Sequence, residues 1–344
     1  MKNMSKSTSH PVVVIPNLNG GEELLSAVKS LIGQTLNPHI IVVDNASADG
    51  SVEKLQAAYP SVEIILNGRN EGYAGGVNPG LRRAIELGAD YAAPFNDDAV
   101  ADKDWLKHLV DYLEKHPEVG AAACKVLKTD GKYIDSTGDF YTVWGLPYPR
   151  GRGEVDSGQY NAQTDIFAAS GAASLFRVET LKEVGLFDED FFAYYEDVDL
   201  GFRMQLAGWK VAFVPDSVVY HAIGMTSGRI KGFTTYQAMK NTTLLLYKNV
   251  PRKFLWRVGW RHLVIHTLFF ARSVTRGQGW IALRGDARGT FLLFKKHAER
   301  KRIQKSRKVS DEYIWGMMVH NLPPNANVLR ILRTRWWKII GRKT

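Results

Sequence analysis

The first hundred residues alternate short apolar runs with amphipathic stretches, and this alternation constrains the fold more than any other feature of the chain. Each of the first three apolar runs is followed by a stretch whose apolar residues have helical spacing. The expected strands are Pro11–Asn17, His39–Ser47, Val62–Gly68 and Asp90–Asp97, and the expected helices are Gly21–Gln34, Ser51–Tyr59 and Asn78–Gly88. Because the strand segments are largely apolar, the pattern predicts a parallel, doubly wound α/β sheet that is covered on both faces.

Polar residues end or follow each of the four predicted strands. They are Asn17, Asp44, Arg69–Asn70 and Asp97–Asp98. The carboxyl ends of parallel strands meet at one edge of a sheet, and ligands of such sheets bind beyond that edge. We therefore expect these four groups to surround one pocket. Asp44 alone would also suit a helix cap, because the residues after it are rich in turn formers.

The segment Asn70–Gly80 contains four glycines in eleven residues. Glycine permits close backbone approach and positive φ, so we expect a loop whose N–H groups can hold a diphosphate. An ordinary glycine-rich turn without a ligand is the alternative. The segment lacks the spacing of a P-loop, and no dinucleotide-binding motif follows the first strand.

Asp97 and Asp98 form an acidic pair directly after the fourth predicted strand. Hard divalent cations that bind together with phosphates take one or two protein carboxylates, so the pair predicts a metal–diphosphate site. A helix cap is the alternative, but Asp102 could supply the cap alone. His221 closes a later predicted strand, and its interpretations as metal ligand and as structural histidine weigh evenly.

Three acids within four residues, Glu196, Asp197 and Asp199, stand next to an aromatic run. Asp199 is four residues before Arg203 and is expected to form a structural ion pair with it. An acid beside an apolar wall has a raised pKa and can act as a general base. We assign that role to Asp197, with Glu196 assisting.

The net charge of +10 divides sharply, with −12 in residues 1–228 and +22 in residues 229–344. Within the basic part, Phe254–Arg272 is expected to form a helix with apolar residues on one face and Arg or His on the other, and residues 333–340 pair Trp with cations. Such segments are typical of an anionic membrane surface, with ordinary packing helices as the alternative. No apolar run is long enough to span a bilayer, and no nucleic-acid-binding motif is present.

Seven motifs in order resemble those of the family 2 glycosyltransferases, which are inverting enzymes with the GT-A fold. They run from Pro11 to His221, and to Gly228 with the following loop. The motifs are VVVIPNLNG, IIVVDNASADGS, NEGYAGGVNPG, FNDDA, ASGAASLFR, GLFDEDFFAYYEDVDLGFR and VVYHAIGMTSG. Within the family, they look most like bacterial rhamnosyltransferase-type enzymes of cell-surface polysaccharide synthesis.

The resemblance implies a Rossmann-like, mostly parallel GT-A domain over residues 1–228, divided into a nucleotide-binding half (11–119) and an acceptor-side half (120–228). A basic, mainly helical region follows at 229–344, where it could bind a membrane or acceptor or mediate oligomerisation.

The resemblance also implies roles for individual residues. The expected nucleotide-binding residues are Pro16, Asn17, Asn19, Asp44, Arg69, Asn70, Gly72, Gly75, Gly76, Asn96 and Asp97. The residues expected near the donor or acceptor sugar are Gly171, Ala172, Tyr195 and Trp209. Asp98 matches the metal-binding acid of the family's D-x-D motif, in which Asn96 replaces the first acid, and His221 matches a further ligand. Asp197 matches the catalytic base, beside Glu196.

The implied activity is a metal-dependent, inverting transfer of a sugar such as L-rhamnose. A UDP- or dTDP-sugar would be the donor, a hydroxyl of a glycan or polyprenyl-diphosphate-linked molecule the acceptor, and Mg²⁺ or Mn²⁺ the cofactor. We expect a cytoplasmic protein held peripherally on the inner face of the cell membrane, without a nucleic-acid partner. The oligomeric state stays open, a homodimer included.

Two other functions remain open from the sequence. A nucleotidyltransferase that makes nucleotide sugars would need Arg and Lys directly after the first strand, where PNLNGGEE offers no cation. A non-catalytic protein that binds membranes or nucleic acid through its basic part would keep its function when Asp98 or Asp197 is replaced.

Overall fold

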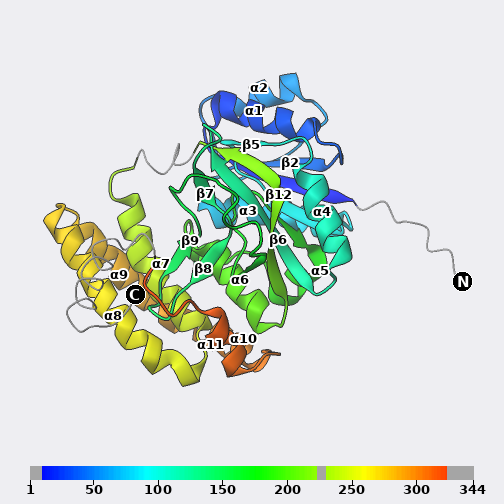
Figure 1. Cartoon of the computed structure of the whole chain (residues 1–344). Helices are drawn as coiled ribbons and strands as arrows, with labels where there is room; N and C mark the ends of the chain where they lie inside the picture. The colour runs from blue at the N-terminus through cyan, green and yellow to red at the C-terminus, as the bar shows by residue number, and fades with distance from the viewer. Residues whose placement is uncertain (1–9, 223–229, 324–344) are drawn as a thin grey trace, which may run out of the picture.

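The computed structural model describes residues 10–222 and 230–323 (Figure 1). The predicted boundary between residues 228 and 229, the loop before it from residue 223 and the cationic Trp segment 333–340 lie outside the described residues. No helix in the described part combines the length and the apolar character needed to cross a bilayer.

The elements follow one another from a strand–helix alternation into a set of helices at the carboxyl end. In chain order they are β1 (Pro11–Asn17), α1 (Gly21–Ile32), β2 (His39–Asp44), α2 (Ser51–Ala58), β3 (Glu63–Leu66), α3 (Gly72–Glu86), β4 (Tyr91–Pro94), β5 (Ala99–Ala101), α4 (Trp105–Lys115), β6 (Val119–Lys128), β7 (Ile134–Ser136), β8 (Asp139–Tyr141), β9 (Pro147–Pro149), β10 (Asp165–Ile166), β11 (Ser174–Arg177), α5 (Val178–Val184), the 3-10 helix η1 (Glu189–Phe191), α6 (Glu196–Leu206), β12 (Lys210–His221), α7 (Phe233–Asn249), α8 (Arg252–Thr275), α9 (Gly279–Lys295), α10 (His297–Lys305) and α11 (Asp311–Met317).

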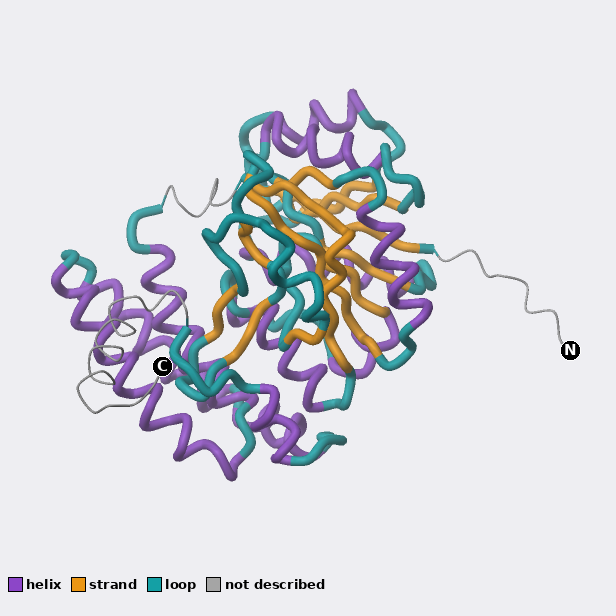
Figure 2. The backbone as a smooth tube through the Cα atoms, in the orientation of Figure 1, coloured by secondary structure: helices purple, strands orange, loops and turns teal. Residues whose placement is uncertain are grey.

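One large sheet forms the centre, with the strand order β10-β12-β6-β11-β4-β1-β2-β3. The parallel arrangement predicted for the first four strands is confirmed, and Asn17 of β1 lies beside Asp44 of β2. Beyond β4 the sheet is mixed, because β11 lies between β4 and β6 and runs antiparallel to both. The architecture is therefore α/β, with helices around a central sheet (Figure 2), and the parallel, Rossmann-like part comprises β1 to β4.

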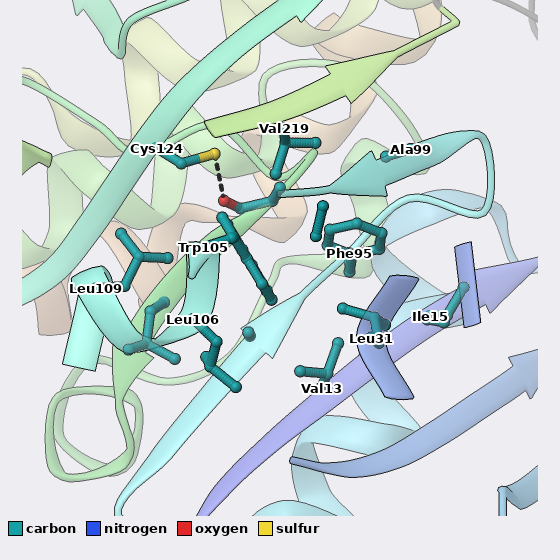
Figure 3. Packing of buried hydrophobic residues seen from close by; sticks show 14 of the residues in the cluster. Val13, Ile15, Leu31, Phe95, Ala99, Trp105, Leu106, Leu109, Cys124 and Val219 are labelled. Carbon is teal, nitrogen blue, oxygen red and sulfur yellow. Dashed lines mark hydrogen bonds between the residues drawn. The ribbon is translucent and has the colours of Figure 1, made fainter. Parts of the chain in front are cut away.

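The sheet is buried on both faces, as β1 illustrates: its side chains point alternately into two apolar clusters, one on each face. Val13 and Ile15 pack with α1 and α4, in the cluster around Trp105 drawn in Figure 3. Val12 and Val14 pack on the other face, with α3, α5 and α6. A strand that is buried on both faces is apolar along most of its length, which explains the continuous apolar run that precedes Asn17.

The predicted glycine-rich loop is wrong, because α3 begins at Gly72 and includes Gly75 and Gly76. These glycines bring the helix close to its neighbours. Gly72 has a φ of +71°, and a Cβ there would lie 2.3 Å from the carbonyl oxygen of Phe192. At Gly76, a Cβ would lie 2.4 Å from Nδ2 of Asn45. Composition alone does not separate this use of glycine from a turn.

Helices α7 to α11 gather on one side of the molecule, at the lower left of Figure 1. A third apolar cluster joins them to the sheet-containing part, with Phe191 and Phe202 from one side and Leu244 and Phe254 from the other. The expected separation of faces on α8 is wrong. Its buried side carries Phe254, Val258, His262 and Ile265, while large apolar residues also lie on its exposed side.

Candidate active site

The direction of the strands explains why residues far apart in sequence meet at one edge of the sheet. β1 to β4 all end at this edge. β12 runs parallel to β6, and both run in the direction of β4, because the intervening β11 is antiparallel to β4 and β6. His221 at the end of β12 therefore joins Asn17, Asp44 and Asp98, and the segment Gly171–Ala172 that leads into β11 begins at the same edge.

Asn17 and Asp44 form a buried polar pair at the ends of β1 and β2. The side-chain amide of Asn17 donates to Oδ1 of Asp44 at 2.7 Å and also lies within hydrogen-bond distance of the Ser47 and Ser51 hydroxyls. Oδ2 of Asp44 accepts from the backbone nitrogen of Ser47 at 3.0 Å. The two side chains thus order the loops that would border a nucleotide.

Asp98 and His221 form the second pair at this edge. Oδ1 of Asp98 and Nε2 of His221 are 3.0 Å apart, and the amide of Asn96 lies 3.0 Å from the same ring nitrogen. Burial alone would lower the pKa of His221, but the hydrogen bonds to Asp135 and Asp98 outweigh burial and raise the pKa to about 9. Residues from β12 and from the segment after β4 therefore point at one place.

Asp135 on β7 is a residue of this site that the sequence analysis missed. Its Oδ2 lies 3.0 Å from Nδ1 of His221, and its Oδ1 lies 2.9 Å from Nε of Arg152. A carboxylate on the second ring nitrogen is the usual support of a metal-binding histidine, because it fixes the tautomer and the ring orientation. No local motif marks Asp135, since its position depends on the pairing of β7 with β6.

The donor set of the Asp98–His221 pair fits a divalent cation. A carboxylate oxygen and an imidazole nitrogen suit Mn²⁺, and Mg²⁺ also accepts one or two protein ligands alongside phosphate oxygens. Burial and the neighbouring charge of Asp98 raise the pKa of Asp97 to about 7, although the hydrogen bond from the backbone nitrogen of Leu18 and the nearby His221 partly offset the effect. Among the described residues, no group of three or more His, Cys, Asp or Glu could hold a metal alone, so a ligand would have to supply further donors.

The segment Gly171–Ala172 links the metal-binding candidates to the predicted base. The backbone nitrogen of Asn96 donates to the carbonyl oxygen of Ala172 at 2.9 Å. One residue earlier, the backbone nitrogen of Gly171 donates to Oδ2 of Asp197 at 3.0 Å. The hydroxyl of Tyr73 on α3 donates to the carbonyl oxygen of Gly171 and fixes this segment from the other side. These two hydrogen bonds bring Asn96, Gly171, Ala172 and Asp197 together, whereas their roles toward a nucleotide sugar stay predictions.

Asp197 is the better proton acceptor of the Glu196–Asp197 pair. Burial raises the pKa of Asp197, although hydrogen bonds from the backbone nitrogens of Gly171 and Val198 partly offset the effect. Burial and the charge of Asp197 raise the pKa of Glu196 well above its ordinary value, and its Oε2 has no hydrogen-bond partner. Asp197 is only half-buried, so an acceptor hydroxyl could reach it. A second missed carboxyl, that of Asp139, has a pKa raised by burial and by the charge of Asp197.

The loop before Asp197 is held in an unfavourable conformation by α7. Phe192, Tyr194 and Tyr195 have φ angles of +64°, +69° and +72°, in a region that the backbone of residues other than glycine rarely adopts. The side-chain amide of Asn241 lies 2.8 Å from the carbonyl oxygen of Ala193 and 2.7 Å from that of Tyr194. Strain of this kind persists only where surrounding contacts enforce it.

Other expected site residues have specific placements. Pro16 and Asn19 lie on and just after the end of β1, and Asn70 accepts from the backbone nitrogen of Gly72. Arg69 is exposed and pairs with Glu71. Asp102 does not cap α4, because the residue before that helix is Asp104.

Trp209 is not brought to the site. It precedes β12, so the twelve-residue strand separates it from His221, and its indole nitrogen donates to Glu183 at 3.0 Å. Asp197 lies at the first turn of α6 and Trp209 lies beyond the end of that helix. The expectation that Trp209 contacts a sugar is therefore wrong.

Comparison with known proteins gives consistent results. The sequence model described as "Glycosyl transferase family 2" matches residues 12–185, which is half of the chain. An N-acetylglucosaminyl-diphospho-decaprenol L-rhamnosyltransferase of Mycobacterium tuberculosis is 30% identical over 239 residues, covering 64% of this chain and 78% of the relative. A dTDP-rhamnosyl transferase of Shigella flexneri, RfbF, is 28% identical over 223 residues, covering 62% and 72%.

A solved structure shares the architecture at low sequence identity. The mannosyltransferase PcManGT of Pyrobaculum calidifontis, in complex with GDP-Man and Mn²⁺, superposes with a TM-score of 0.51 and 17% identity. The match covers 86% of this chain and 84% of that chain. At this identity the likeness concerns the fold alone.

Proposed function

Since this chain belongs to glycosyl transferase family 2 and is a glycosyltransferase, we propose that it transfers L-rhamnose, with inversion, from a dTDP- or UDP-sugar to a hydroxyl of a lipid-linked glycan. The observation that carries this proposal is the hydrogen bond from the Gly171 backbone to Asp197, next to the bond from Asn96 to Ala172. Two adjacent residues thereby connect the proton acceptor with the candidate metal–diphosphate site. An inverting displacement needs these two groups on either side of one sugar.

Asp197 carries the proton transfer in this mechanism. Its carboxylate accepts the proton of the acceptor hydroxyl while the hydroxyl oxygen forms a bond to the anomeric carbon of the donor. The bond from that carbon to the diphosphate breaks, and the nucleoside diphosphate leaves with the electron pair. The backbone N–H groups of Gly171 and Val198 orient the carboxylate and keep it ionised more readily than Glu196.

Asp98 and His221 would hold the divalent cation, with Asp135 orienting the imidazole. Bound there, Mg²⁺ or Mn²⁺ would offset the negative charge that builds on the leaving diphosphate. Asn17 and Asp44 order the loop beside this pocket and would border the base and ribose.

The names of two relatives support the choice of substrates. The relative from Mycobacterium tuberculosis is named as a rhamnosyltransferase whose acceptor is an N-acetylglucosaminyl-diphospho-decaprenol, and that from Shigella flexneri as a dTDP-rhamnosyl transferase. We extend both features to this chain: a deoxyhexose donor and an acceptor on a polyprenyl diphosphate. An enzyme with such an acceptor works at a membrane surface, and we place this chain peripherally on the cytoplasmic face.

A panel of nucleotide sugars tests the proposal. A ligand that binds the folded chain raises its melting temperature by mass action. We expect dTDP-rhamnose or a UDP-sugar to raise the melting temperature only when Mn²⁺ or Mg²⁺ is present, and the same donor to be consumed with a lipid-linked acceptor. Stabilisation by GDP-mannose alone, or by no donor with either metal, would contradict the proposed substrate class.

A further inference from the structure

Large apolar side chains on the exposed surface are concentrated on two neighbouring helices. Eleven of the seventeen exposed large apolar residues of the described chain belong to α8 and α9. They are Trp256, Trp260, Leu263, Val264, Leu268, Phe269, Val274, Trp280, Leu283, Phe291 and Phe294, and we call this set the α8–α9 outer surface. Trp256 and Phe294 are each 80% exposed, so neither is a core residue at its margin.

The opposite sides of the two helices are already buried, which makes the outer surface a second apolar side. On α8, Val258 and Ile265 are buried, and on α9, Gly285 and Gly289 pack against α7. Large apolar side chains that gather on the exposed side of two neighbouring helices are typical of a surface that contacts another molecule or lipid. The described residues leave this surface uncovered.

The charge of the two helices indicates what covers it. Residues 252–295 contain nine Lys or Arg and a single acid, Asp286, which lies 3.0 Å from His266. Arg261 and Arg288 lie over the rings of Trp260 and Phe291, at 5.2 and 5.3 Å from the ring centroids. Trp, Phe and Leu alternating with cations are typical of a helix that lies in the headgroup region of an anionic bilayer.

A second copy of the chain fits this surface less well. A two-fold interface brings the same patch of two subunits together, so the cations of one copy would face the cations of the other. Juxtaposed like charges oppose association, whereas anionic headgroups neutralise them.

We propose that the α8–α9 outer surface docks on an anionic phospholipid membrane and thereby holds the active site beside it. The docking itself does not depend on the proposed function, but the role that we give it, which is access to a lipid-linked acceptor, rests on that function. α7 provides the connection: Gly289 of α9 packs against the backbone of Lys240, whose ammonium group donates to the carbonyl oxygens of Asp190 and Phe191. One helix layer, about 10 Å thick, therefore separates the membrane-facing helix from the loop that leads to Asp197.

Vesicle flotation of the full-length chain tests the docking without donor or acceptor. We expect binding to phosphatidylcholine vesicles that contain phosphatidylglycerol, weaker binding at high salt, and little binding to phosphatidylcholine alone. The combined variant Trp256→Ser, Trp280→Ser and Phe294→Ser should reduce partitioning at least about tenfold. The matched control, Ile32→Ser with Leu87→Ser, replaces exposed apolar residues elsewhere and should bind as the wild type does. Unchanged binding by the triple variant would overturn the proposal.

A fluorescent probe gives a second measurement that does not depend on partitioning. The single cysteine, Cys124, is buried, so a cysteine introduced by Phe294→Cys can be labelled selectively with an environment-sensitive dye. We expect a blue shift with anionic vesicles for this position and none for Leu87→Cys. The alternative result is that light scattering finds a dimer for the wild type and a monomer for the triple variant, while the dye shows no blue shift. That result would assign the surface to contact with a second copy of the chain and would overturn the proposal. The triple variant should still transfer the sugar to a water-soluble acceptor. Loss of vesicle binding therefore tests the docking, and loss of transfer to the soluble acceptor tests the proposed activity, so the two failures are distinguishable.

Discussion

The ammonium group of Lys248 on α7 lies 2.9 Å from the carboxylate of Asp199 on α6, and neither side chain is exposed. Lys248 also contacts Asp188 at 2.6 Å and Glu299 at 2.9 Å. Arg203 pairs with Asp199 at 2.9 Å, as expected from their spacing. Part of the charge contrast between the two halves of the sequence is therefore internal, because basic residues of the carboxyl-terminal helices neutralise acids next to the active site.

Replacing Lys248 by Met should destabilise the whole molecule. The variant removes the cation that Asp188 and Asp199 share, and only Lys296 and Arg203 then remain beside these buried acids. The loss should approach, but not exceed, the about 3–5 kcal/mol of a buried charge left without any partner. Chemical denaturation measures the change in the free energy of unfolding. Lys253→Met, which removes an exposed pair with Glu312, serves as the control and should change little. Equal, small effects of both variants would mean that the buried cluster contributes no stability.

Asn241→Ala should impair turnover more than donor binding. The side chain holds the carbonyl oxygens of Ala193 and Tyr194 in the strained loop before Asp197. A displacement of the base by about 1 Å can reduce kcat about a hundredfold, while the donor site lies elsewhere. Steady-state kinetics should show a lower kcat with an unchanged KM for the donor. Thr242→Val, at a buried neighbour on the same helix, is the control; a similar loss there would indicate general disruption of α7.

Asp135→Asn should weaken metal binding. Asp135 supports His221 from the ring nitrogen opposite Asp98, and loss of such a support typically lowers metal affinity about 10–100-fold. Titration of Mn²⁺ in the presence of the nucleoside diphosphate, followed by electron paramagnetic resonance, measures the free ion directly. Asp156→Asn removes a different carboxylate, which pairs with Lys125, and should leave the affinity unchanged. An unaltered affinity in Asp135→Asn would remove His221 from the proposed ligand set.

As the pH is lowered, the rate of transfer should begin to fall at a higher pH than it would with an ordinary aspartate as the base. Burial raises the pKa of Asp197, and only the ionised carboxylate accepts a proton. Activity should therefore increase as pH rises through this raised pKa and then reach a plateau. The profile of kcat/KM against pH measures it, and the donor affinity should lack the same transition. Constant activity down to pH of about 4 would exclude a base with this environment.

Local patterns were sufficient to predict the parallel strands β1 to β4 and the edge of the sheet at which the site lies. The strands β1 to β4 are continuous apolar runs, and the polar residues after them meet because the strands are parallel. Asp199 and Arg203 could be paired because both lie on one helix. In each of these cases, the relevant partners are close in sequence or follow one repeated rule.

The remaining features depend on contacts between distant segments. The start of α3 was missed because the glycines there serve close packing against Asn45 and Phe192 rather than a loop. Asp135 reaches His221 through the pairing of β7 with β6. Trp209 follows the acidic motif closely in sequence, but α6 carries the chain to the opposite end of β12.

The central claim is that Asp197 is the proton acceptor and that donor binding depends on other residues. Asp197→Asn keeps the shape of the side chain but cannot accept the proton, so the rate of transfer should fall by about 10²–10⁴-fold. Binding of the nucleotide sugar with Mn²⁺, measured by calorimetry on the same preparation, should stay within about twofold of the wild type. Glu189→Gln, an exposed acid before the same loop, should retain activity. Transfer by Asp197→Asn at a rate close to that of the wild type would contradict the account.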